Sequence, residues 1–240
     1  MIRRVVPDSA LRRTLPNIGL ASEIKWETKA LLLHYRWART ARCRFRGRTG
    51  LRANIGCGPR PAPGWENLDV RAGSDVICWD CRRGLPFDDA SVAVIFSEHV
   101  FEHLDRPRST RAFLSECLRC LAPGGVLRLV VPDAGMYLDA YAARDWDALV
   151  RNRPLEPADG GYRDHWLHET YRTRMEVVNA VFRQRTEHKY AYDAETLMLD
   201  LGAAGFSSVI HQAFGKSVLP GAALDTPERA SESLYVEAVK

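Results

Sequence analysis

The sequence lacks any apolar run of about 18 residues, so no segment is long enough to cross a membrane as a helix. Near its start, charged residues and prolines interrupt the chain before the apolar region of a signal peptide can form. Low-complexity segments and internal repeats are also missing, which excludes fibrous and repeat architectures. From these absences we expect a soluble, cytoplasmic protein without a transmembrane segment.

The chain has six cysteines, and their spacing does not fit a zinc site. The pairs Cys78-x-x-Cys81 and Cys117-x-x-Cys120 lie too far apart in the sequence for a zinc ribbon. Cys117 also follows Phe113 at helical spacing, which indicates a thiol packed in the core. Because disulfides do not persist in the cytoplasm, we expect free, packed thiols.

What is present is the composition of an ordinary globular protein. Of the 240 residues, 46% are hydrophobic and 27% are charged, which excludes a disordered chain. A chain of this length can bury a sizeable core, so we expect one α/β domain with an insertion.

The net charge of +4 is concentrated near the start of the chain, where six arginines lie between positions 36 and 48. A helix is predicted over residues 22–39, and we treat residues 1–50 as a basic helical extension of the main domain. A basic face of this kind suits nucleic acid, an acidic substrate or a membrane surface. Charge runs are more often only solvated, so we favour a solvated helix that packs on the domain.

From residue 51 onward, strand-like and helix-like segments alternate, which is typical of a parallel sheet with helical crossovers. Strands are predicted over residues 51–55, 66–69, 75–78, 91–96 and 126–131, and a helix over 107–121. Towards the end, a helix is predicted over 194–204 with Asp193 as its cap. An antiparallel pair of strands over 207–214 and 233–239 completes the sheet.

Polar residues follow the predicted strands at the point where each strand ends. They are Asp69, Asp80, Glu98, His99 and Asp133, and Gly56 stands at the end of the first strand. Ligands of open α/β sheets bind beyond the carboxyl ends of the strands, so these residues converge on one edge if the sheet is parallel. Each acid on its own is equally consistent with a helix cap or a turn.

The glycine turn after the first strand does not fit a dinucleotide-binding protein. The pattern G-x-G-x-x-G needs a third glycine where Pro61 stands, and the ribose-binding acid should follow by about 20 residues. Asp69 comes only 13 residues after Gly56, through a proline-rich connection too short for a full crossover helix. Without that helix a pyrophosphate loses its amino-terminal dipole, so the pattern favours a nucleoside ligand without phosphates.

Four segments carry a family resemblance: NIGCGPRPAPGWENLD, LPFDDASVAVIFSEHVFEHL, LSECLRCLAPGGVLRLVVPD and VFRQRTEHKYAYDAETLMLDLGAAGF. In this order the chain resembles class I S-adenosylmethionine-dependent methyltransferases of the type 11-like bacterial group. The resemblance implies a Rossmann-like α/β fold over residues 51–240, with a seven-stranded, mostly parallel sheet of order 3-2-1-4-5-7-6. It also implies S-adenosyl-L-methionine as the cofactor.

By the same resemblance, the cofactor-binding residues are Gly56, Cys57, Gly58, Asp69, Val70, Asp80, Cys81, Ser97 and Glu98. The two glycines would let the backbone approach the methionine and ribose, and Asp69 would accept both ribose hydroxyls. Asp80, with the amide of Cys81, would read the adenine, while Ser97 and Glu98 would contact the methionyl end. The helix that usually follows the glycine turn in this family is absent or rudimentary in the pattern.

Methyl transfer to a hydroxyl group needs an aligned acceptor and a base for its proton. Histidine suits this role near neutral pH. The candidates are His99 and His103, which are four residues apart, and His188.

Residues 134–192 interrupt the alternating pattern and are rich in aromatic side chains. We predict that they form a helical cap insertion over the strand ends, which could enclose the acceptor and exclude water. The same rings could equally form the cap's own core. His165-x-x-His168 has helical metal-ligand spacing, but no second motif accompanies it, and we predict no metal site.

We therefore predict a methyltransferase that acts on an oxygen atom of a small molecule or saccharide. Two alternatives stay open: a nucleic-acid methyltransferase that uses the arginine-rich face, and a non-catalytic scaffold that binds the cofactor. The acceptor's identity, the choice among O-, N- and C-methylation, and the oligomeric state do not follow from the sequence.

Overall fold

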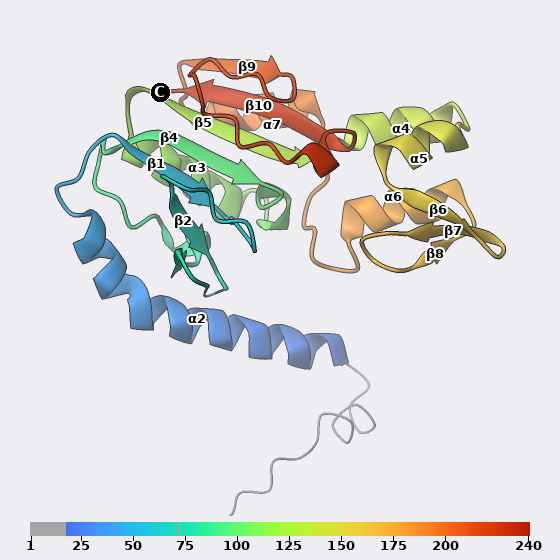
Figure 1. The fold of residues 1–240 in the computed structure, drawn as a ribbon, viewed down its shortest axis with the longest axis horizontal. Coiled ribbons are helices and arrows are strands. Elements are labelled where there is room, and N and C mark those ends of the chain that lie inside the picture. The colour runs from blue at the N-terminus through green and yellow to red at the C-terminus, as the bar shows by residue number, and fades with distance from the viewer. Residues whose placement is uncertain (1–17, 72) are drawn as a thin grey trace, which may run out of the picture.

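The computed structural model describes residues 18–71 and 73–240 (Figure 1). The first part of the predicted extension, residues 1–17, lies outside the described residues. Figure 1 shows a large sheet with its helices, a smaller cap beyond one end of that sheet, and a long helix, α2 (Ile18–Phe45), below it. No helix in the described ranges combines the length and the apolar character that a membrane span requires.

The main sheet has seven strands in the order β3-β2-β1-β4-β5-β10-β9. They are β1 (Leu51–Ile55), β2 (Glu66–Asp69), β3 (Val76–Cys78), β4 (Val92–Glu98), β5 (Leu121–Pro132), β9 (Ser208–Gln212) and β10 (Ser233–Val239). The first five are parallel, and β10 runs antiparallel to both of its neighbours. Numbered along the chain within this sheet, the order is 3-2-1-4-5-7-6, so the predicted Rossmann-like α/β fold class is confirmed.

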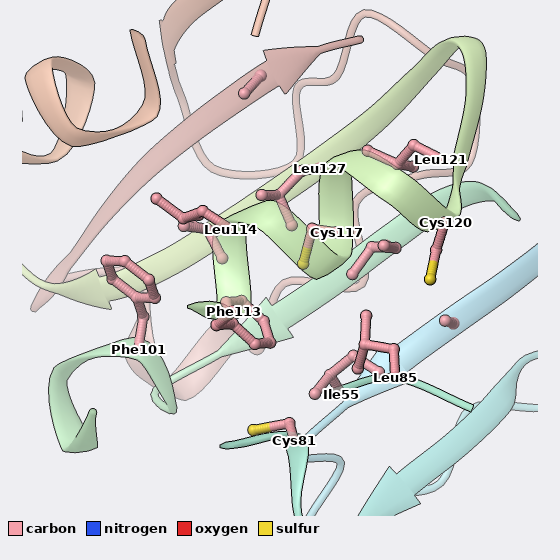
Figure 2. Close-up of a cluster of buried hydrophobic side chains, with 14 of the residues drawn as sticks. Ile55, Cys81, Leu85, Phe101, Phe113, Leu114, Cys117, Cys120, Leu121 and Leu127 are labelled. Carbon is pink, nitrogen blue, oxygen red and sulfur yellow. The ribbon is translucent and has the colours of Figure 1, made fainter. Parts of the chain in front are cut away.

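The core forms where helix α3 (Arg108–Cys120) buries one face against the sheet. Phe113, Leu114 and Cys117 lie on that face, at the spacing that places side chains on one side of a helix. Figure 2 shows Cys117 between Leu114 and Leu121, and its thiol is fully buried, as its helical spacing predicts. Every cysteine in the described residues is free.

Helix α7 (Ala194–Ala203) packs on β9 and β10 and adds further apolar side chains to this core. Its first turn is capped by Asp193, whose carboxylate accepts a hydrogen bond from the amide of Thr196 at 2.8 Å. The predicted cap is therefore confirmed.

The sequence predicts a helical insertion over residues 134–192, but the structure shows both helices and strands there. The insertion contains α4 (Ala134–Ala142), α5 (Trp146–Asn152), α6 (Arg174–Arg183) and a three-stranded sheet of β6 (Leu155–Ala158), β7 (Gly161–Asp164) and β8 (Thr170–Tyr171). Asp159-Gly160 forms the turn between the paired strands β6 and β7, and Gly160 has a φ of 76°. Asp-Gly is a typical two-residue hairpin turn, and this local signal outweighs the helical tendency of its surroundings.

The cap has a hydrophobic core of its own, which includes Tyr137, Leu149, Tyr171 and Val177. Tyr137 is fully buried and donates a hydrogen bond to the carbonyl of Asn152. Some of the aromatic residues thus stabilise the cap itself. In Figure 1 the cap lies beyond the carboxyl ends of β4 and β5, the position from which it can cover a ligand at the strand ends.

Helix α2 extends six residues beyond the predicted end at residue 39 and contacts β3. The ring of His34 packs on Trp79, with centroids 4.4 Å apart. Leu32 and Tyr35 remain exposed on the outer face of the same helix. One side of α2 therefore docks on the domain, while the other side is open.

Three short 3-10 helices complete the described chain, η1 (Cys81–Arg83), η2 (Phe101–His103) and η3 (Pro227–Arg229). The first two follow β3 and β4 directly. They place Asp80, Glu102 and the neighbouring histidines at the carboxyl edge of the sheet.

Candidate functional site

The turn after β1 is held in a conformation that only glycine tolerates. Gly56 has a φ of 74°, and a β-carbon at this position would lie 2.1 Å from Cγ2 of Val100. Its amide donates to the carbonyl of Leu68 at 2.7 Å, which ties the turn to β2. Gly58 also has a positive φ, of 54°, but nothing within 4 Å would meet a side chain there. The turn thus leaves backbone exposed to a ligand on the Gly58 side.

Asp69, at the end of β2, forms a hydrogen bond with the glycine turn at Gly58. Its Oδ2 accepts a hydrogen bond from the amide of Gly58 at 2.9 Å, and its Oδ1 accepts one from the amide of Arg71 at 2.8 Å. A carboxylate has about four lone-pair positions, so each oxygen keeps an acceptor site for a further donor. The connection between β1 and β2 contains turns and no helix, as its prolines predict.

The carboxylate of Asp80 is engaged by arginines. Its Oδ1 accepts from Nε of Arg82 at 2.9 Å and its Oδ2 from Nη2 at 2.8 Å, while Nε of Arg83 lies 3.4 Å away. Burial raises the pKa of Asp80, but the bonds and charge of Arg82 outweigh it and hold the pKa below its ordinary value.

The same group links to α2. Arg82 extends past Asp80 to Glu27, with Nη1 2.7 Å from Oε1, and the amide of Asp80 faces Nδ1 of His34 at 3.4 Å. Helix α2 is therefore attached at the carboxyl end of β3, where the sequence resemblance implies adenine recognition. Cys81, its predicted partner, is buried in the core.

At the end of β4, two predicted residues differ in how they are satisfied. The hydroxyl of Ser97 is buried and has no hydrogen-bond partner. Glu98 is held by Thr226, whose amide and hydroxyl donate to its carboxylate at 3.0 and 2.5 Å. Of the two, Ser97 offers an unused polar group, whereas Glu98 anchors the connection before β10.

The remaining predicted residues are more ordinary. Cys57 is buried and its pKa is raised to about 12 by burial, so its thiol is neutral. Val70 is half-buried after β2. Asp133 caps α4 by accepting hydrogen bonds from the amides of Gly135 and Met136, which is the helix-cap role that a single acid at a strand end also predicts.

The three candidate histidines gather around one buried acid, Glu102. Nδ1 of His99 lies 3.6 Å from Oε1 of Glu102, and the Nε2 atoms of His103 and His188 each lie 3.9 Å from it. The rings of His103 and His188 meet edge to face, with centroids 4.8 Å apart. Residues directly after β4, in η2 and after α6 thus lie in one cluster.

Hydrogen bonds fix the tautomers of two of these rings. Nδ1 of His103 donates to the carbonyl of Glu187 at 3.2 Å, and Nδ1 of His188 donates to that of Val181 at 2.6 Å. A carbonyl oxygen can only accept, so both Nε2 atoms carry lone pairs in the neutral rings. Burial lowers the pKa of His103 and brings that of His188 to about 4, so both rings are neutral at pH 7.

Glu102 was missed at the sequence level. Its side chain is 2% exposed, neither carboxylate oxygen has a hydrogen-bond partner, and burial raises its pKa to about 8. The spacing His99-x-x-Glu102-His103 was the available signal. From the sequence, a role is predicted for the two histidines of this segment and none for the acid between them.

The second histidine pair, in the cap, does not form a site. His165 and His168 are both exposed, and His168 adopts a φ of 56° rather than continuing a helix. Their spacing therefore does not place them on one helical face.

Two cavities lie in the described part of the chain, and one of them adjoins the histidine cluster. One of about 440 Å³ lies between the end of α2 and η1, away from the glycine turn, and its lining includes Arg42, Arg46 and Arg119. A second of only about 10 Å³ is lined by Glu102, His188 and Tyr192. The small cavity adjoins the histidine cluster and has room for about one water or ion.

Residues 63–129, from the connection before β2 to β5, match a family described as a methyltransferase domain. No curated protein matches the chain. One similar solved structure is the 1,6-didemethyltoxoflavin-N1-methyltransferase of Burkholderia thailandensis with bound 1,6-didemethyltoxoflavin and S-adenosylhomocysteine. It is 13% identical, with 100% of this chain and 93% of that one covered and a TM-score of 0.44. Another, a SAM-dependent methyltransferase from Archaeoglobus fulgidus, is 15% identical, with 93% and 100% covered and a TM-score of 0.47.

Proposed function

Starting from a chain that is a class I S-adenosylmethionine-dependent methyltransferase, we propose that it methylates a hydroxyl oxygen of a small molecule or saccharide. The single observation that supports this choice is the cluster of neutral histidines at the carboxyl end of β4. A hydroxyl acceptor must lose a proton on methylation, and an imidazole with a free lone pair can take it.

The glycine turn and Asp69 suit the cofactor. The open space at Gly58 admits a ligand to the backbone, and the lone pairs left on Asp69 can accept the two ribose hydroxyls. Ser97 pairs with Ile55 across β1 and β4, and its unpartnered hydroxyl can meet the methionyl end. Asp80 suits adenine recognition only if its contact with Arg82 loosens.

We assign the base to His103, because its side chain is 32% exposed whereas that of His188 is 5% exposed. When bound, S-adenosylmethionine supplies an electrophilic methyl group on a sulfonium whose thioether leaves without charge. Nε2 of His103 would accept the proton of the acceptor O–H as that oxygen is methylated. His188 packs edge to face against His103 and positions it.

The cap contributes by position. It lies beyond the ends of β4 and β5, so it can exclude water and hold the acceptor in line with the methyl group (Figure 1). Its partly exposed aromatic rings, Tyr141 and Trp166, are available to stack on a sugar or another ring.

A nucleic-acid acceptor is less well supported. Arg44 and Arg48 of the arginine-rich segment both pair with Glu66, at 3.1 and 2.7 Å. Arginines that already pair with a carboxylate on the domain offer less charge to phosphates. Retention of the protein on RNA with a steep salt dependence would favour this alternative.

The test is release of S-adenosylhomocysteine across a library of phenols, polyols and saccharides. We expect turnover with a hydroxyl acceptor and a fall of about a hundredfold or more in His103→Ala. His211→Ala is the matched control, because His211 is exposed on β9. Turnover only with amines would contradict the O-methylation proposal, and cofactor binding without turnover on any acceptor would favour the scaffold alternative.

A further inference from the structure

The carboxylate of Glu102 is buried without a hydrogen-bond partner among the described residues. Three histidine nitrogens face it at 3.6–3.9 Å. These separations are too long for hydrogen bonds. A buried acid without partners is costly, and a bound cation would offset that cost.

We propose that Glu102, His103 and His188 bind one divalent transition-metal cation of the zinc type. The ligand atoms of these three residues all lie within 4.8 Å of one another. In a tetrahedral site with bonds of about 2.0–2.1 Å, ligand atoms lie ~3.4 Å apart, so side-chain rotations that shorten the longest separation by up to about 1.4 Å would close the site.

The orientation of the rings matches that of metal ligands. Each Nδ1 donates to a backbone carbonyl, so each Nε2 keeps its lone pair, and each Nε2 lies 3.9 Å from Oε1 of Glu102. Metal-binding histidines almost always donate their second ring N–H to a carbonyl or a carboxylate in this way. Two imidazoles and one carboxylate form a common catalytic zinc set, whereas magnesium prefers oxygen ligands.

The two segments that carry the ligands are joined before any cation binds. The amides of Lys189 and Tyr190 donate to the carbonyl of Glu102 at 2.7 and 3.2 Å, which holds the His188 segment against η2. The small cavity lined by Glu102 and His188 adjoins the site. His103 is partly exposed and provides a path from solvent.

The charges nearby are mixed. Arg229, Arg153 and Lys189 oppose a metal, and Glu98, Glu187 and Glu232 offset them. His99 lines the fourth side, but its Nε2 is hydrogen-bonded to Ser233 at 2.9 Å, so we assign it no ligand role. A position on the cation therefore stays open.

This inference deepens the proposed function and rests on it only for its catalytic consequence. A cation would take the lone pair of His103, so His103 would act as a ligand and the cation would lower the pKa of the acceptor hydroxyl in its place. Metal binding itself does not depend on methyl transfer.

The test is calorimetric titration of untagged, chelator-treated protein with Zn²⁺, together with the absorption spectrum of the Co²⁺ form. We expect one site, visible Co²⁺ bands without thiolate charge transfer, and a loss of about tenfold or more in affinity in both Glu102→Gln and His188→Ala. His211→Ala should bind as the wild type does. Circular dichroism checks that each variant folds, and Glu102→Gln is close in shape to the native residue.

No saturable binding, or equal affinity in Glu102→Gln and the wild type, would overturn the inference. Both titrations are done without cofactor or acceptor, so their failure leaves methyl transfer untouched. Turnover measured with and without chelator then decides the catalytic consequence. A bound metal in a protein that methylates nothing would contradict the proposed function and leave the metal site standing.

Discussion

A β-carbon on Gly56 would lie 2.1 Å from Cγ2 of Val100, closer than any two such atoms can approach. The glycine turn after β1 and the segment that carries the histidine cluster are therefore packed directly against each other. The turn proposed to bind the cofactor and the segment with His99 and His103 therefore meet at this contact.

The first prediction concerns this contact. Gly56→Ala should reduce the free energy of unfolding by on the order of 2–4 kcal/mol, because it combines steric overlap with a positive φ. Gly58→Ala also places a side chain at a positive φ but causes no steric overlap, so it should reduce the free energy of unfolding by about 1–2 kcal/mol. Urea unfolding of both variants checks the difference, and equal losses would show that Val100 moves aside easily.

The second prediction concerns Asp69. Asp69→Asn keeps the shape and an acceptor for Gly58 but loses the charge, so affinity for S-adenosylhomocysteine should fall about tenfold or more. Calorimetry measures this, with Asp139→Asn on the exposed face of α4 as the control. Unchanged affinity in Asp69→Asn would remove Asp69 from the cofactor site.

The third prediction concerns pH and Asp80. Because the pKa of Asp80 is lower in the folded protein than in the unfolded chain, its contribution to stability is present above about pH 4 and is lost as the pH falls further. Asp80→Asn should therefore cost about 1–3 kcal/mol at pH 7, and progressively less below pH 4. Unfolding free energies of both proteins between pH 3 and 7 test this. A difference independent of pH would mean that the ion pair with Arg82 does not stabilise the fold.

The fourth prediction concerns a buried network behind the sheet. Arg128 is fully buried and pairs with Asp225 at 2.5 Å and Glu237 at 3.1 Å. Arg128→Leu leaves two buried carboxylates without their cation, so it should cost on the order of 3–5 kcal/mol. The exposed Arg163→Leu serves as the control in the same urea titration. Similar stability of the two variants would show that water replaces the guanidinium.

Much of the fold could be predicted because it depends on local patterns. The alternation of strands and helices from residue 51 onward placed the five parallel strands, and Asp193 marked the start of the last helix. The small sheet of the cap was missed. Its Asp159-Gly160 turn is a two-residue signal inside a long segment that was read as helical.

The site was predictable to the extent that it lies at strand ends. His99 and His103 are four residues apart, but His188 joins them only through tertiary packing. No local sequence pattern predicts that the three histidines surround Glu102. Likewise, the sequence does not reveal that Arg82 engages Asp80, because Glu27 and His34 come from a helix far away in the chain. Long-range contacts of charged groups are set by the fold as a whole.

The attachment of α2 has a consequence for how the protein responds to its cofactor. Asp80 secures this helix through Arg82 and Glu27, and we also propose it for adenine recognition. The contact with Arg82 and the contact with adenine are then thermodynamically linked. Adenine binding weakens the attachment of α2 by the same factor by which that attachment weakens adenine binding. Filling the cofactor site would raise the amide hydrogen exchange of α2, and α2 would report occupancy from outside the sheet.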